Sequence, residues 1–394
     1  MKSTSMKPTM KSSSLARAFA AVSLALLPLL AGADELNMPV GVTDMSREIF
    51  DLHMLIFWIC VAIGVVVFGA MGYSMYAHRK SKGYEPATFH ESTKLEIAWT
   101  VVPMLILIGM AVPATQVLVD IYDFGGEDMA VEVRGYQWKW QYKYLDDDLQ
   151  EQVSYFSNLS TPREQINNRQ DKGDNYLLEV DNPLVIPAGK KVRFLLTAND
   201  VIHSWWVPDF GVKKDAIPGI INQAWTIVEE PGIYRGQCTE LCGKDHGFMP
   251  IVVKVVPQDE FDAWYADQQG IAAAVEEESR QEFSADELFA RGEEVYQANC
   301  AACHQENGLG TAPVYPAIAG SEIATGPVRD HLEIVYNGRA GTAMAAFGAQ
   351  LTPTELAAVT HYQRNAFGNS TGDVVQPQDV LAFFAQAQEQ SQGQ

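Results

Sequence analysis

The sequence predicts a multidomain membrane protein in which a two-helix transmembrane hairpin precedes an antiparallel β-domain and a small all-α domain. Three observations lead to this prediction. Two long apolar runs lie near the N-terminus, a stretch of short strand patterns separated by turn residues follows them, and the composition changes to Ala, Gln and Glu after Pro257. With 394 residues, the chain is long enough for two or three domains.

Residues 1–33 have the pattern of a secretory signal peptide. Basic residues as far as Arg17 precede an apolar core, Ala18 to Leu30, and Ala31-Gly32-Ala33 is a small-residue cleavage site. An uncleaved anchor helix is the alternative, but the apolar core is short for one. We therefore expect an exported protein whose mature chain begins at Asp34.

Residues 34–119 hold the two predicted transmembrane helices. Leu55 to Ala77 and Ile97 to Val119 contain no charged side chain, and each run can cross a hydrocarbon core of about 30 Å. Cytoplasmic loops are enriched in Lys and Arg, so the basic loop between the two runs should face the cytoplasm. The later domains then lie on the outer side of a bacterial-type cell membrane. The basic residues of this loop are Arg79, Lys80, Lys82 and Lys94.

Residues 120–257 are expected to form an antiparallel sandwich or a Greek-key barrel, because several short strand patterns alternate with turn residues. Ala130 to Tyr144 alternates apolar and polar residues and is predicted to be one strand. The polar stretch Gln150 to Asn175 is predicted to be a long loop. Further strand patterns are Tyr176–Val180, Val192–Thr197, Ala224–Val228, Ile233–Gln237 and Ile251–Val256.

The remaining residues predict helices. Residues 258–283 are expected to form a helical linker, and residues 284–368 a small helical domain. Ser284-Ala-Asp-Glu287 and Thr352-Pro-Thr-Glu355 are capping-box patterns, each of which marks the start of a helix. The Gln-rich tail, residues 369–394, is predicted to be disordered.

Charge and cysteine usage narrow the class of function. The formal net charge is −21, so nucleic-acid binding is not expected, because phosphate contacts need clustered Lys and Arg. The acidity suits a basic protein partner, although solubility alone would also account for it. Four of the five cysteines lie in two motifs, and Cys60 lies in the first apolar run. We therefore expect the cysteines to hold cofactors rather than structural disulfides.

One short part of the β-domain is dense in soft metal ligands. Two thiolates, two imidazoles and a thioether form a ligand set that suits copper. The two sulfurs lie on one turn and can bridge two copper ions, with the methionine and a backbone carbonyl as weaker ligands. Zinc and a buried cysteine pair are alternatives, but zinc prefers four strong ligands and leaves the methionine without a role. The candidate ligands are His203, Cys238, Glu240 through its carbonyl, Cys242, His246 and Met249.

A second motif, Cys300-Ala-Ala-Cys303-His304, is the attachment sequence of a covalent c-type haem. Cys300 and Cys303 would form the thioether links, and His304 would supply one axial ligand. Met344 is the candidate for the other, with His331 and His361 as alternatives that we expect at the surface. Met344 is favoured because His/Met ligation raises the haem potential towards that of a copper centre.

The motifs of the β-domain resemble those of subunit II of haem–copper cytochrome c oxidases. The resemblance covers roughly Met45 to Pro257 and rests on His203-Ser-Trp-Trp-Val-Pro, Asp215-Ala-Ile-Pro-Gly219 and Gln237-Cys-Thr-Glu-Leu-Cys-Gly-Lys-Asp-His-Gly-Phe-Met-Pro250. It implies a cupredoxin-like barrel that holds a binuclear CuA centre on the six candidate ligands. The C-terminal domain is similar to a class I cytochrome c, and the fusion resembles the caa-type oxidases.

The resemblance implies further roles. Trp138 corresponds to the residue through which electrons enter from cytochrome c, whereas Trp140 is expected to pack the barrel. The family commonly has an aromatic residue where this chain has Lys139. Glu96 corresponds to the entry of a proton channel into subunit I. The Glu240 side chain corresponds to a ligand of a magnesium ion at the interface with subunit I.

The leading hypothesis is an electron-input subunit of a proton-translocating cytochrome c oxidase, with no oxygen-reducing site of its own. Electrons would pass from a reduced donor to the fused haem, then to CuA and then to the haem–copper site of subunit I. Its expected partners are subunit I, subunit III and a cytochrome c donor. A copper-delivery protein is an alternative, but such proteins need at most one membrane anchor and carry no haem. A quinol oxidase subunit would lack the copper ligands. A CuA-bearing component of a nitrous oxide or nitric oxide reductase is disfavoured by Glu96 and the helical hairpin.

Overall fold

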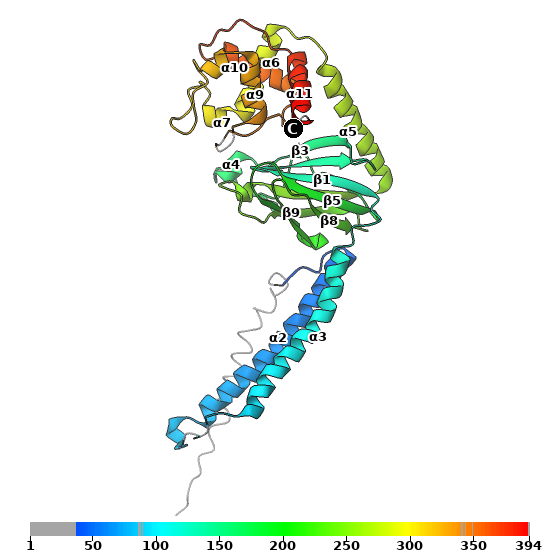
Figure 1. Ribbon diagram of the computed structural model, residues 1–394, viewed down its shortest axis with the longest axis vertical. Helices are drawn as coiled ribbons and strands as arrows, with labels where there is room; N and C mark the ends of the chain where they lie inside the picture. The colour runs from blue at the N-terminus through cyan, green and yellow to red at the C-terminus, as the bar shows by residue number, and fades with distance from the viewer. Residues whose placement is uncertain are drawn as a thin grey trace, which may run out of the picture. The chain divides into compact units, whose positions relative to one another are not determined.

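The computed structural model describes residues 37–392 except 86, 87, 89, 340, 341, 343 and 349. The predicted signal peptide therefore lies outside the described residues. The chain divides into two compact units, Met1–Asp262 and Ala263–Gln394. Figure 1 labels the helices and strands of both units.

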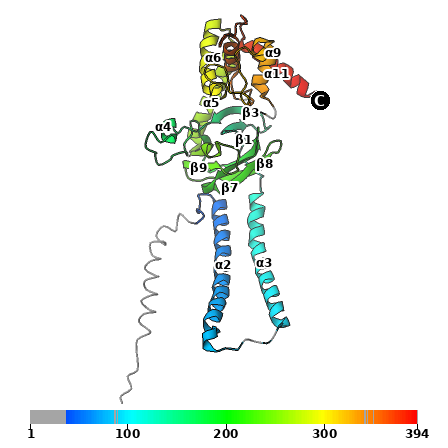
Figure 2. The same cartoon turned by 90° about the vertical axis from the view of Figure 1, so that its left-hand side faces the viewer.

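Two long apolar helices begin the first unit. They are α2 (Asp44–Ala77) and α3 (Thr93–Ile121), joined through the short helix η2 (Lys80–Lys82). Figure 2 shows α2 and α3 as the two arms of a hairpin. Their apolar side chains are largely exposed, and both helices are long and apolar enough to cross a membrane. Both predicted runs are therefore helical, and each helix extends beyond its run.

The hairpin is hydrogen-bonded to the β-domain at both of its outer ends. Before α2, the Thr43 hydroxyl donates to the Phe210 carbonyl at 3.0 Å. At the end of α3, the Trp225 indole donates to the Ile121 carbonyl at 3.1 Å. Gly211 (φ 68°) allows close approach here, because a Cβ on it would lie 3.0 Å from Ser46 Cα. These contacts fix where the membrane helices enter the β-domain.

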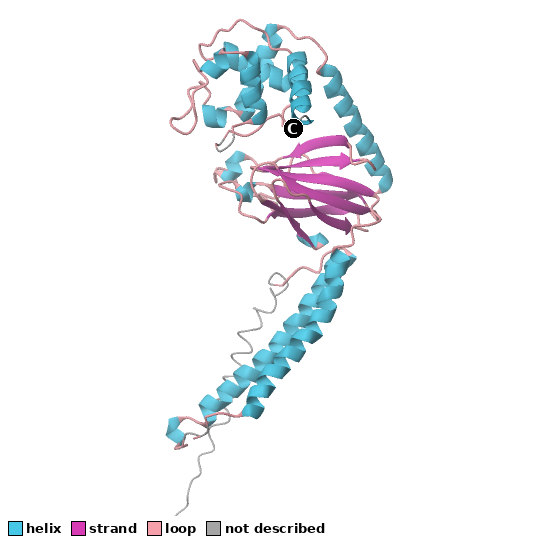
Figure 3. Cartoon of the chain, viewed as in Figure 1, coloured by secondary structure: helices cyan, strands magenta, loops and turns pink. Residues whose placement is uncertain are grey.

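The β-domain is a sandwich of two five-stranded sheets (Figure 3). One sheet has the order β3-β2-β1-β5-β8, and the other has the order β4-β10-β9-β6-β7. Most pairs are antiparallel, whereas β1 pairs with β5, and β10 with β4, in parallel. The strands are β1 (Met129–Tyr136), β2 (Lys139–Leu145), β3 (Glu151–Ser157), β4 (Leu184–Pro187), β5 (Lys191–Ala198), β6 (His203–Val207), β7 (Val212–Ala216), β8 (Asn222–Ile227), β9 (Gly232–Cys238) and β10 (Pro250–Val256).

Several strand predictions are corrected by the structure. The run predicted as one strand, Ala130 to Tyr144, is the hairpin β1–β2, because the chain reverses at Gln137-Trp138 without a Gly or Pro to mark the turn. The predicted loop Gln150 to Asn175 contains β3 and the helix α4 (Arg163–Ile166). Tyr176–Val180 is not a strand and makes only an isolated bridge from Val180 to Leu159. The strands β4, β6 and β7 were not predicted.

The helical elements after the sandwich follow the capping signals. Ser284 and Thr352 each accept from the backbone three residues later in a complete capping box, as predicted. The predicted linker is largely the helix α5. The helices are α5 (Gln258–Glu278), α6 (Ala285–Asn299), α7 (Ala301–His304), α8 (Glu322–Thr325), α9 (Val328–Asn337), α10 (Pro353–Asn365) and α11 (Pro377–Gln392).

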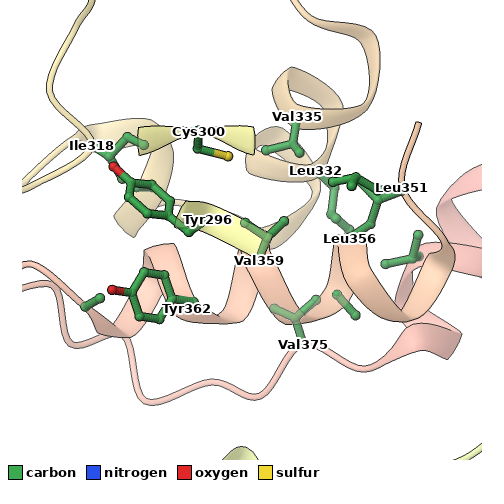
Figure 4. Close-up of a cluster of buried hydrophobic side chains, with 14 of the residues drawn as sticks. Tyr296, Cys300, Ile318, Leu332, Val335, Leu351, Leu356, Val359, Tyr362 and Val375 are labelled. Carbon is green, nitrogen blue, oxygen red and sulfur yellow. The ribbon is translucent and has the colours of Figure 1, made fainter. Parts of the chain in front are cut away.

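The prediction of a disordered tail is wrong for most of its length. Val375, Val380 and Phe383 are buried in the core of the helical unit, and the Phe383 and Phe384 rings pack on Tyr336. Figure 4 shows this core, in which Val375 lies beside side chains of the earlier helices. The tail is rich in Gln, so its few apolar residues did not suggest an ordered segment, although the core buries them.

Gly292 provides a stability prediction. It lies on α6 where α10 crosses it, and an added Cβ would stand 2.1 Å from the Ala358 carbonyl oxygen. Gly292→Ala should therefore destabilise the helical unit by about 1–3 kcal/mol, although Gly→Ala in a free helix stabilises by about 1 kcal/mol. Gly270→Ala on α5, where the Cβ meets nothing within 4 Å, is the control and should not destabilise. Calorimetry measures the melting temperature of each variant. Equal melting temperatures would contradict the close contact of α6 with α10 at Gly292.

Candidate metal centre and haem-attachment site

The candidate copper ligands converge around the loop between β9 and β10. The Cys238 sulfur lies 3.8 Å from the Cys242 sulfur, 4.0 Å from His203 Nδ1 and 3.4 Å from the Glu240 carbonyl oxygen. The Cys242 sulfur lies 3.5 Å from His246 Nδ1 and also 3.5 Å from the Met249 sulfur. Each sulfur thus has one imidazole and one weaker donor beside it. The six donors come from the start of β6, the end of β9 and the loop before β10.

The chemistry of this donor set fits copper. His203, Cys238, Cys242 and Met249 are buried, with the His203 side chain fully enclosed. Thiolate, imidazole and thioether are donors that copper prefers. A zinc site would use four strong donors and would not need the buried thioether.

The protonation of the two thiols is coupled. Burial opposes ionisation of Cys238, but hydrogen bonds from His203 and the backbone lower its thiol pKa overall. Burial, followed by the neighbouring Cys238 charge, raises the pKa of Cys242. Cys238 therefore ionises more readily than Cys242, and the positive charge of a bound cation would favour ionisation of both.

Two residues that the sequence analysis missed hold the His203 ring. Asp200 Oδ1 lies 2.9 Å from His203 Nε2, and Asp200 Oδ2 accepts from the Gln137 backbone at 2.8 Å. Gly135 leaves room for the ring, because a Cβ there would lie 2.7 Å from the imidazole. The ring therefore turns Nδ1 towards the sulfurs, as an outer-shell carboxylate does for a metal-binding histidine. An acid three residues before a candidate ligand was the available signal.

The two tryptophans of the β1–β2 hairpin both contact the ligand loop. Trp138 is half-buried, and its indole donates to the Cys242 carbonyl at 3.2 Å. Trp140 is fully buried and donates to the Met249 carbonyl at 3.3 Å. Between them, the Lys139 ammonium lies 4.6 Å from the centre of the Phe156 ring, and burial lowers its pKa to about 8. Trp138 is thus the tryptophan of this pair that is both partly exposed and bonded to a candidate ligand.

Two predicted site residues lie apart from this cluster. Glu96 is exposed in the first turn of α3. The Glu240 side chain is also exposed, and it is the backbone carbonyl of this residue that faces the Cys238 sulfur.

The haem-attachment motif lies in the helical unit. Cys300 ends α6 and is buried, whereas Cys303 and His304 lie on α7 and are half-buried. His304 Nδ1 lies 2.9 Å from the Pro316 carbonyl oxygen. A carbonyl can only accept, so Nδ1 carries the proton and Nε2 has a free lone pair that a metal ion could use. These residues fit a covalent haem, and Met344 is half-buried downstream.

The two alternative axial histidines are buried, which corrects the expectation that they lie at the surface. His331 is 3% exposed, and its Nε2 lies 2.8 Å from Gln363 Oε1. His361 is 4% exposed, and its Nδ1 lies 3.3 Å from Asn365 Nδ2. His361 is covered because α10 packs against α6, α9 and α11, and His331 is covered because α9 packs against α10 and α11. Both rings therefore already have partners inside the core.

Two apolar helices, a sandwich carrying a soft-ligand cluster and a helical unit with a haem motif define a membrane-anchored electron-transfer protein. Comparison with known protein families leads to the same class. Residues 31–117 match the transmembrane domain, and residues 129–256 the periplasmic domain, of cytochrome c oxidase subunit II. Residues 287–362 match cytochrome c oxidase, cbb3-type, subunit III. The chain belongs to the cytochrome c oxidase subunit II family and carries an additional cytochrome c domain.

Individual proteins of this family are similar to the chain over most of their length. The probable cytochrome c oxidase subunit 2 of Rickettsia felis is 41% identical over 231 residues, which span 58% of this chain and 70% of the relative. Cytochrome c oxidase subunit 2 of Cereibacter sphaeroides is 37% identical over 240 residues, which span 58% of this chain and 78% of the relative. The protein is therefore a subunit of an oxidoreductase complex, with copper and haem c as its cofactors. The alternatives of copper delivery and of a nitrogen-oxide reductase component fall away.

Proposed function

We propose that this chain is the electron-input subunit of a respiratory, proton-translocating cytochrome c oxidase. It passes electrons from cytochrome c through the fused haem c and then the copper centre to the oxygen-reducing site of subunit I. The observation that carries the proposal is the pairing of Cys238 and Cys242, with sulfurs 3.8 Å apart and one imidazole beside each. Two bridging sulfurs with two flanking histidines suit a binuclear copper centre, CuA, better than a single ion.

The residues of the chain keep this centre rigid. When bound, the copper pair and the haem c supply one-electron carriers. Asp200 fixes the His203 ring, and the Trp140 indole holds the Met249 carbonyl. The fully buried Trp140 and Trp205 side chains exclude water from the sandwich behind the ligands. A rigid, dry ligand shell keeps the rearrangement that accompanies electron transfer small.

Electrons from the fused haem c are proposed to enter the copper centre at Trp138. Its partly exposed ring and its hydrogen bond to the Cys242 carbonyl join the protein surface to a copper ligand in one step. The family resemblance gives the same role to this position. In the second unit, Cys300 and Cys303 attach the haem, and His304 and Met344 are proposed as its axial ligands.

Further roles follow from family membership. Glu96, at the start of α3 next to the basic loop, is proposed at the entry of a proton channel into subunit I. The exposed Glu240 carboxylate is proposed to bind an interfacial magnesium ion with subunit I. Subunit III is a further proposed partner. Both cofactor-bearing domains are proposed to face the outer side of the cell membrane.

Replacing Trp138 tests the proposed entry point. Trp138→Leu should slow electron entry into the copper centre by about 10- to 100-fold, because an outer-shell partner of a copper ligand is lost. Copper content should remain unchanged. Stopped-flow reduction of the assembled oxidase measures the rate.

Trp225→Leu is the matched control for this experiment. Its indole also donates to a backbone carbonyl, that of Ile121, but far from the ligand loop in sequence. It should leave the rate of entry unchanged. Equal rates for Trp138→Leu and the native oxidase, with full copper in both, would contradict entry at Trp138.

A further inference from the structure

Three buried polar side chains form a chain of contacts inside the helical unit. The His331 Nε2 atom on α9 lies 2.8 Å from Gln363 Oε1 on α10, and Gln363 Nε2 lies 3.8 Å from the Cys300 sulfur. The three residues are 3%, 4% and 8% exposed. Figure 4 shows Cys300 among the aliphatic and aromatic side chains of this core, and the ion pair of Arg364 and Asp373 acts on His331.

Covalent attachment at Cys300 decides which group donates and which accepts in this row of hydrogen bonds. A thiol can donate a hydrogen bond, but a thioether sulfur has no proton and can only accept one weakly. The amide of Gln363 must therefore turn its NH₂ group towards the sulfur and its oxygen towards His331. Because the amide oxygen only accepts, His331 must carry its proton on Nε2. The histidine thereby holds the glutamine in the one orientation that satisfies the sulfur.

Burying His331 and Gln363 lowers the stability of the fold, so we expect the two residues to have a role beyond packing. His331 Nδ1 is buried without a hydrogen-bond partner among the described residues, and such a buried polar atom loses its interactions with water. Burial also lowers the pKa of His331 to about 4, so the ring is neutral near pH 7. Two apolar side chains of similar size would fill the same space without an unpaired atom. The pair therefore places a neutral hydrogen-bond donor beside the attachment cysteine.

We infer that Gln363, oriented by His331, is a positioning residue that hydrogen-bonds the Cys300 thioether sulfur and raises the reduction potential of the haem. This inference rests on the proposed haem attachment at Cys300. A donor at the sulfur withdraws electron density from the macrocycle and so favours the reduced iron. Hydrogen bonding around a haem is one of the ways in which a protein sets its potential.

The test is an optical redox titration of the haem c band in the full-length chain within its oxidase complex. Gln363→Leu should lower the midpoint potential, and His331→Leu should lower it by a smaller amount. The double variant should match Gln363→Leu, because His331 acts through the glutamine. Thr360→Val is the matched control. It also removes a buried polar group from α10, one without a partner among the described residues, and should leave the potential unchanged.

Several outcomes would overturn the inference. A native potential in Gln363→Leu, with haem attached through both cysteines, would do so, and so would an equal shift in Thr360→Val. If Gln363→Leu fails to take up haem, His331→Leu alone must lower the potential, or the inference fails. A haem assay under denaturing conditions separates the two proposals. Wild-type protein without covalent haem would refute the attachment at Cys300 itself.

Discussion

Cys242→Ser should remove the paired copper centre and lower oxidation of cytochrome c by more than the about 100-fold typical of an outer-shell change. The Cys242 sulfur lies within 3.8 Å of three other donor atoms, which belong to Cys238, His246 and Met249. A serine oxygen is a poorer copper ligand and a poorer bridge. Copper analysis and steady-state turnover of the purified oxidase measure the two effects.

Cys60→Ser is the matched control for this substitution. Cys60 is an exposed cysteine on the membrane helix α2, distant in sequence from the copper ligands. This variant should keep native copper content and native turnover. If Cys242→Ser also retained two coppers and native turnover, the bridging role of Cys242 would be wrong.

His304→Ala should abolish electron input through the haem-bearing unit. The Pro316 carbonyl accepts from His304 Nδ1 and holds the ring in place, whereas alanine offers no ring nitrogen to the iron. Turnover with the native donor should fall to background, whereas a small chemical reductant should still reduce the copper centre directly. Unchanged turnover with the native donor would show that the fused haem is not on the main path.

A redox titration and an optical spectrum of the haem separate Met344 from His361 as the other axial ligand. Met344→Leu should keep the covalent haem and lower its potential, because the thioether ligand is lost. His361→Leu should leave ligation intact, since this ring already contacts Asn365 within α10. A ligand-field spectrum that changes in His361→Leu but not in Met344→Leu would reverse the assignment.

Most of the candidate site could be predicted from the sequence, because several of the potential metal ligands lie close together along the chain. Cys238 and Cys242 share one short turn, and their spacing already indicates a shared metal. His203 was also named from the density of soft ligands in this segment, although it lies on a different strand, β6. The supporting residues Asp200 and Gly135 were not predicted, because their role depends on contact with the His203 ring, which the sequence does not show.

The fold was predictable where its signals are local and less so where they are long-range. Hydropathy predicted α2 and α3, and capping boxes predicted the starts of α6 and α10. The β1–β2 reversal at Gln137-Trp138 carries no turn residue, so it was missed. The helix α11 was missed because its few apolar residues matter only through the core that covers them.

The most direct test of the central claim is metal and haem analysis of the purified full-length chain, together with electron paramagnetic resonance. The account predicts two coppers and one covalent haem c per chain, with a mixed-valence signal shared between both coppers. A single copper or a zinc ion, without a mixed-valence signal, would contradict the binuclear centre and with it the proposed route of electron input.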